Sequence, residues 1–129
     1  MDYEKIKAAA AGYREDMSRF LRAMIARPSE SCREKEVAAC IRAELERLGY
    51  DEVEVDGLGN VIGWLGRGDR IIALDSHIDT VGVGNRDNWT ADPYEGWEDE
   101  AVIYGRGASD QEGGMAAAAY GGKLMKDLG

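Results

Sequence analysis

The stretch IIALDSHIDTVGVG, residues 71–84, contains the only histidine of the 129-residue chain. It opens with an apolar run, residues 71–74, of the kind found in β-strands that are buried on both faces. We therefore predict an inner strand over residues 70–76 with His77 at its end. In an extended chain, residues i and i+2 point to the same side, so His77 and Asp79 should project together if the strand continues that far.

Helical periodicity flanks this strand in the sequence. Apolar residues at three- and four-residue steps predict helices before and after it, and Ser31 and Glu34 have the spacing of a capping box. A period of two predicts hairpins on either side of the strand. The predicted elements are helices at 3–26, 33–48 and 112–128, hairpin strands at 52–55 and 61–65, a loop from Gly82 to Pro93, and a second hairpin with its tip at Glu98–Glu100. This order predicts the α/β class, a layered sheet with helices packed on it, in which the sheet is incomplete.

Composition and charge limit the classes of partner. With 44% hydrophobic and 32% charged residues the chain has the composition of one soluble globular domain. The net charge of −9 argues against nucleic acid or an anionic membrane surface as a partner. Cys32 and Cys40 would lie about 12 Å apart on a helix, too far for a disulfide, and reduced thiols suit the cytoplasm. Residues 1–20 carry charges throughout, so no signal peptide or membrane span is predicted.

Two sequence features could form a cation site. His77 and Asp79 give the H-x-D pattern, in which a carboxylate can hold one imidazole nitrogen while the other binds metal. Residues 104–116, YGRGASDQEGGMA, place Asp110 after a glycine-rich turn at a helix start, where a carboxylate would repel phosphate and attract a cation. The alternatives are structural: His77 could simply end a strand, and Asp110 could be a helix N-cap.

Four segments together resemble a known enzyme family. LDSHIDTV (74–81), NWTADPYEG (88–96) and YGRGASDQEGG (104–114), preceded by RPSESCREKEVAACIRAELERLGY (27–50), resemble the zinc-dependent metallohydrolases that include aminoacylase, acetylornithine deacetylase, succinyl-diaminopimelate desuccinylase and carboxypeptidase G. SDQEGG is more similar to the selenium-metabolism-linked hydrolase branch than to the commoner pattern, which has lysine at the position of Glu112. The resemblance implies that residues 1–129 are the N-terminal part of a zinc-exopeptidase-like catalytic domain, without the lid and dimerisation domain.

The resemblance also implies roles for individual residues. His77 would bind one zinc ion, Asp110 would bridge two zinc ions, and Asp79 would be the catalytic residue that clamps the imidazole. The peptide bond from Asp110 to Gln111 would be cis. Cobalt or manganese could also occupy such a nitrogen and oxygen site. The loop beside the site would be shaped, through substrate contact or packing alone, by Trp89, Asp92, Pro93 and Tyr94.

The implied activity is hydrolysis of amide bonds in N-acyl amino acids or small peptides by zinc-activated water. The family's general-base glutamate and its remaining metal ligands follow the bridging aspartate, but residues 111–129 contain one glutamate, Glu112, and no histidine. We therefore expect this chain to hold two of five zinc-binding side chains and to be inactive alone; a homo-oligomer is left open. One alternative is a non-catalytic remnant that acts as a folding or interaction module. Another is a metal-free hydrolase that uses His77 and Asp79 with Ser76 or Ser109, which the predicted strand and loop geometry disfavours.

Overall fold

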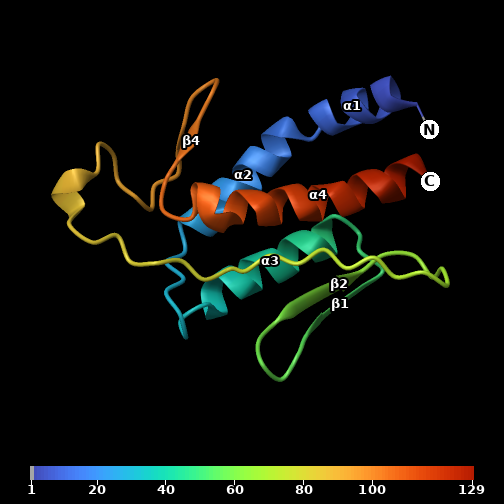
Figure 1. The fold of residues 1–129 in the computed structure, drawn as a ribbon, viewed down its shortest axis with the longest axis horizontal. Helices are drawn as coiled ribbons and strands as arrows, with labels where there is room; N and C mark the ends of the chain where they lie inside the picture. The colour runs from blue at the N-terminus through green and yellow to red at the C-terminus, as the bar shows by residue number, and fades with distance from the viewer. Residues whose placement is uncertain (1) are drawn as a thin grey trace.

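The structure, a computed structural model, describes residues 2–129, within which three of the four α-helices enclose one core and two short hairpins extend from it (Figure 1). Helix α2 packs against α3 and α4, α1 runs beside α4, and the first hairpin lies against α3. The elements are α1 (Tyr3–Ala11), α2 (Arg14–Ile25), α3 (Lys35–Arg47), β1 (Glu52–Val55), β2 (Val61–Trp64), the 3₁₀ turn η1 (Arg86–Asn88), β3 (Trp97–Glu98), β4 (Ile103–Tyr104), the irregular turn η2 (Ala108–Glu112) and α4 (Gly113–Leu128).

The first predicted helix is divided in two. The Asp2 side chain caps α1, accepting the backbone N–H of Glu4 at 3.1 Å, and the helix ends at Gly12. Glycine is a poor helix former, and the next residue, Tyr13, departs from helical geometry with φ −95° and ψ 0° before α2 begins. The division separates two environments, because α1 buries no side chain whereas α2 buries Phe20, Met24 and Ile25. The prediction of one continuous helix over 3–26 is therefore wrong.

Helix α3 confirms the prediction for 33–48 apart from its start. The predicted capping box is wrong, since no side chain caps the first turn and Glu34 instead accepts the backbone N–H of Cys32 at 2.9 Å. Ser31 is engaged elsewhere, with its hydroxyl 3.0 Å from Asp79 Oδ2. Helix α4 begins within one residue of its predicted start, and Cys32 and Cys40 are both free thiols, as predicted.

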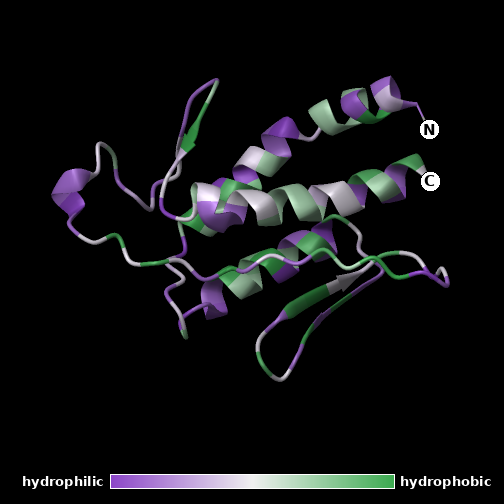
Figure 2. Cartoon of the chain, viewed as in Figure 1, coloured by the Kyte–Doolittle hydropathy of each residue, from purple (hydrophilic) through white to green (hydrophobic). Residues whose placement is uncertain are grey.

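One apolar core joins α2, α3 and α4. The alternation of hydrophobic and hydrophilic residues along these helices is visible in Figure 2. At the core's edge the buried Tyr120 hydroxyl donates to Glu44 at 2.6 Å and accepts from Arg47 at 2.8 Å, so the buried carboxylate of Glu44 is paired with a cation and hydrogen-bonded. The core residues are Phe20, Met24, Val37, Ile41, Leu45, Leu48, Ala116, Ala119 and Tyr120.

Both predicted hairpins are present. Strands β1 and β2 pair antiparallel, with Glu52 opposite Trp64 and Val55 opposite Val61. In the second hairpin Glu98 pairs with Ile103, and the turn is closed by the Asp99 N–H, which donates to the Val102 carbonyl at 3.0 Å. The tip therefore lies slightly later than predicted. Each sheet within residues 2–129 has two strands, which confirms an α/β fold with an incomplete sheet.

The predicted inner strand at 70–76 is wrong. In the part of the chain that the structure describes, these residues join neither sheet and make no backbone–backbone hydrogen bond. Ile71, Ile72 and Leu74 are 76%, 86% and 62% exposed, on a chain that passes in front of α3 in Figures 1 and 2. The physical reason is the lack of a partner: an apolar run becomes a buried strand only when neighbouring strands satisfy its backbone and other elements cover its faces.

Candidate metal centre

The imidazole of His77 lies between two carboxylates. Its Nε2 atom is 3.0 Å from Asp110 Oδ1, and its Nδ1 atom is 3.1 Å from both Asp79 Oδ1 and the Asp79 carbonyl oxygen. The hydrogen bond to Asp110, followed by the backbone carbonyl and charge of Asp79, raises the pKa of His77 above its usual value. All three side chains are open to solvent. The structure thus brings together the three residues that the sequence singled out, although their roles as ligand and clamp remain predictions.

The loop between α2 and α3 holds the chain that carries His77 and Asp79. The Thr80 N–H donates to the Ser29 carbonyl at 2.8 Å, and the buried hydroxyls of Ser29 and Thr80 lie 3.4 Å apart. Next to them, the Ser31 hydroxyl donates to Asp79 Oδ2 at 3.0 Å. Backbone and side-chain contacts to this loop therefore position His77 and Asp79, in place of the predicted strand.

Asp110 lies in an irregular turn that precedes α4. Gly107 has a positive φ of 83°, which a residue with a side chain rarely adopts, and the Glu112 N–H donates to the Gly107 carbonyl at 2.9 Å. The peptide bond between Asp110 and Gln111 is cis, as the resemblance implies. Helix α4 takes its N-cap at Glu112 with no side-chain cap. The alternative in which Asp110 is a helix N-cap is therefore wrong, and its carboxylate faces His77 instead.

Glu112 is a buried acid beside the site that sequence reasoning did not single out as functional. Its side chain is 1% exposed, and burial raises its pKa to about 8. Within residues 2–129 its Oε2 atom has no hydrogen-bond partner. A Cβ atom at Gly107 would lie 2.8 Å from this oxygen, so glycine is required there. The one signal in the sequence was Glu112 itself, which is followed by two glycines and stands where the family that the chain resembles commonly has lysine.

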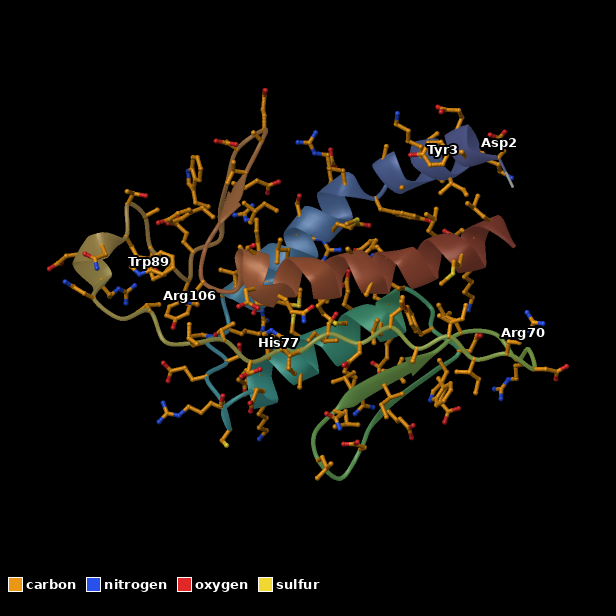
Figure 3. All side chains as sticks on the ribbon, in the orientation of Figure 1. Asp2, Tyr3, Arg70, His77, Trp89 and Arg106 are labelled. Atoms are coloured by element: carbon orange, nitrogen blue, oxygen red, sulfur yellow. The ribbon has the colours of Figure 1, made fainter. Side chains whose placement is uncertain are left out.

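The loop from 85 to 95 is fixed by contacts within its own neighbourhood. The Trp89 indole N–H donates to the Val83 carbonyl at 2.9 Å, and the Arg106 guanidinium lies over the Trp89 ring, 4.9 Å from its centre (Figure 3). Asp92 pairs with Arg86 at 2.9 Å and also accepts the Tyr94 N–H at 2.9 Å. The buried Pro93 accepts the Arg106 N–H at 2.7 Å. Contacts within the chain thus position Trp89, Asp92 and Pro93 and the backbone of Tyr94, and substrate contact by these four residues stays a prediction.

The donor set suits a transition metal but is small. His77 Nε2 and Asp110 Oδ1 lie 3.0 Å apart. If these two atoms moved slightly apart, both could bind one ion at about 2.0–2.2 Å. No group of three or more His, Cys, Asp or Glu side chains in residues 2–129 is arranged to hold a metal. In the same residues neither Ser76 nor Ser109 donates a hydrogen bond to His77, whose partners are the two carboxylates. The metal-free serine mechanism therefore has no support in this geometry.

Comparison with known proteins gives a consistent result. Residues 73–129 match the model of peptidase family M20/M25/M40. The chain is 56% identical over 127 residues to "Uncharacterized protein YgeY" of Escherichia coli (strain K12), covering 98% of this chain and 32% of that protein. It is 34% identical over 96 residues to succinyl-diaminopimelate desuccinylase of Stenotrophomonas maltophilia (strain K279a), covering 73% of this chain and 26% of that protein. It is 43% identical over 58 residues to "Probable succinyl-diaminopimelate desuccinylase" of Staphylococcus aureus (strain Mu50 / ATCC 700699), covering 45% of this chain and 14% of that protein.

The chain spans about a third or less of the length of these relatives. The family match includes His77, Asp79 and Asp110, because all three lie within residues 73–129. Among the described residues, no helix has the length and apolar character needed to cross a bilayer.

Proposed function

Because this chain belongs to peptidase family M20/M25/M40, a family of metallohydrolases, we propose that it forms the first part of a dizinc catalytic domain that cleaves amide bonds. His77 and Asp110 would be zinc ligands, with Asp110 shared between two ions. The observation that carries this proposal is the contact of His77 Nε2 with Asp110 Oδ1 at 3.0 Å across 33 residues of sequence.

Asp79 orients the imidazole in this proposal. When His77 Nδ1 carries the proton and its N–H donates a hydrogen bond to Asp79, the lone pair of Nε2 is directed toward Asp110. Metal-binding histidines commonly use such a carboxylate to fix the tautomer and to raise the basicity of the ligand nitrogen. Zinc, when bound, supplies Lewis-acid activation of water and of the scissile carbonyl. Cobalt or manganese could serve with the same nitrogen and oxygen donors.

The proposed substrates of the complete enzyme are N-acyl amino acids or small peptides. Two of the relatives are named as desuccinylases, which supports an acylated amino acid as the substrate class. The general base and three further ligands would come from parts of the family's catalytic domain beyond residues 1–129. We propose that the 129-residue chain alone is inactive, because two protein ligands fall short of the three or four that hold zinc tightly. A cytoplasmic location is proposed from the free thiols of Cys32 and Cys40 and from the charges throughout residues 1–20, and a homo-oligomer is left open.

The test is zinc titration of the purified chain by calorimetry. We expect weak binding by the wild-type chain and none at this site after His77→Ala or Asp110→Ala, because each change removes one of two ligands. Asp75→Ala is the matched control, since Asp75 is exposed and lies two residues before His77. Binding that is unchanged by His77→Ala would refute the proposed site. Tight binding with turnover of acylated amino acids would refute the proposed inactivity of this chain.

A further inference from the structure

We propose that Ser31 is a positioning residue of this site: its hydroxyl holds the Asp79 carboxylate so that the other carboxylate oxygen faces His77. This inference rests on the proposed metal centre. Ser31 Oγ donates to Asp79 Oδ2 at 3.0 Å, and Asp79 Oδ1 lies 3.1 Å from His77 Nδ1. His77 Nε2 in turn lies 3.0 Å from Asp110 Oδ1. Four side chains thus form one continuous line of polar contacts, in which neutral His77 donates its single ring N–H either to Asp79 or to Asp110.

The Asp79 carboxylate needs such a holder because its surroundings leave it free. Its side chain is 45% exposed, so packing does not fix its rotation. A hydrogen bond on Oδ2 leaves Oδ1 in the direction of the imidazole. Hydrogen bonds to a charged oxygen are the stronger kind, so one hydroxyl can restrict the carboxylate.

The backbone around Ser31 supports a placed hydroxyl rather than a chance contact. Ser31 lies 48 residues from Asp79, in the loop between α2 and α3. That loop is pinned next to it, where the Ser29 carbonyl accepts the Thr80 N–H at 2.8 Å and the two hydroxyls of Ser29 and Thr80 are buried together. Ser31 itself is exposed, so its hydroxyl is not needed to fill the core. Ser29 thus holds the loop between α2 and α3 against the segment that contains Thr80, and Ser31 holds the Asp79 carboxylate.

The expected consequence is control of the histidine tautomer. With Asp79 held in place, neutral His77 keeps its proton on Nδ1 and leaves Nε2 free to bind metal. Without the Ser31 hydroxyl, the Asp79 side chain can rotate away, and Nδ1 keeps only the neutral Asp79 carbonyl, 3.1 Å away, as the acceptor from Asp79. A proton on Nε2 would instead donate a hydrogen bond to the charged Asp110 carboxylate, which is the stronger kind, so the population shifts toward Nε2–H. Metal must then displace a proton from its own ligand atom, which weakens binding.

The test uses the metal-free chain and the fact that His77 is its only histidine. Long-range ¹H–¹⁵N correlation spectra at about pH 9, where a histidine is largely neutral, report which ring nitrogen carries the proton. We expect Ser31→Ala to shift the population from Nδ1–H toward Nε2–H, and Ser31→Thr, which keeps the hydroxyl, to restore it. Ser18→Ala on α2 is the control, with amide spectra showing that each variant is folded. An unchanged tautomer in a folded Ser31→Ala chain, or a shift that threonine does not reverse, would overturn the proposal.

A zinc titration of the same variants gives a second readout. Loss of a group that orients a metal ligand typically costs about 10–100-fold in affinity, and Ser31 lies one hydrogen bond further out, so we expect about 3–10-fold weaker binding in Ser31→Ala. If no variant binds zinc at His77, the metal centre fails, while the tautomer measurement still decides the role of Ser31. If the wild type binds zinc and Ser31→Ala binds it equally well, the positioning role fails and the metal centre stands.

Discussion

Glu112→Gln should change how the stability of the metal-free chain depends on pH. Glu112 is buried, and the pKa of its carboxyl rises from 4.5 to about 8. Between these two values the folded chain keeps the proton and the unfolded chain has lost it. The unfolded state then binds fewer protons, so the free energy of unfolding falls as pH rises through this interval. Glutamine has a similar size and no proton to lose, so it removes this dependence.

The magnitude follows from the shift. Each pH unit within the interval lowers the free energy of unfolding of the wild-type chain by up to about 1.4 kcal/mol relative to Glu112→Gln. From pH 5 to pH 8 the two proteins should diverge by about 3–4 kcal/mol, after allowance for partial titration at each end. Such a difference is a large part of the total stability of a domain, which is about 5–15 kcal/mol.

Urea unfolding of both chains across pH 5–8, with a metal chelator present, measures this divergence. The raised pKa of His77 also makes the wild type lose stability as pH rises, but that contribution is common to both chains and cancels in the comparison. Glu36→Gln, an exposed glutamate in the first turn of α3, is the control and should follow the wild type. Parallel curves for wild type and Glu112→Gln would refute the reasoning, because they would mean that Glu112 is ionised inside the folded chain.

Two further predictions concern packing and association. Gly122→Ala should destabilise the chain by about 1–3 kcal/mol in urea unfolding, because a Cβ atom there would meet the Tyr50 hydroxyl and Leu65, whereas Gly121→Ala, with open space around it, should stabilise by up to about 1 kcal/mol; equal effects would contradict the packing seen here. The exposed apolar run at 71–74 should cause concentration-dependent self-association in sedimentation experiments, which Ile72→Lys should reduce and Leu58→Lys, at an equally exposed turn, should not; if both lysines act alike, the run is not the contact surface.

The helices and hairpins could be predicted because their signals are local. The period of the apolar residues gave α3 and α4 to within two residues, and alternation gave the first hairpin. Two local patterns misled. Ser31 and Glu34 have capping-box spacing, but Asp79 competes for the serine hydroxyl, and Gly12 interrupts a period that otherwise runs through both α1 and α2. The strand at 70–76 failed because its formation depends on partners that lie outside any local window.

The meeting of His77 with Asp79 was predictable from their spacing, and that with Asp110 from the resemblance. Ser31 and Glu112 were not predictable as parts of the site. A serine in a loop carries no signal of which carboxylate it will reach 48 residues later. The burial of Glu112 depends on Gly107, whose backbone comes close to the carboxylate only when the turn before α4 has folded.

The place of α4 in the core also sets the order in which a growing chain can fold. Ala116, Ala119 and Tyr120 complete the core that α2 and α3 begin, and Asp110 lies just before them. A nascent chain that has reached only Tyr104 therefore exposes Phe20, Met24 and Ile41 and offers His77 no second carboxylate. Contacts between segments so distant in sequence form late and slowly. During synthesis the first helices therefore need protection from aggregation for a time. This period ends when η2 and α4 have been made, because they complete the core and bring Asp110 to His77.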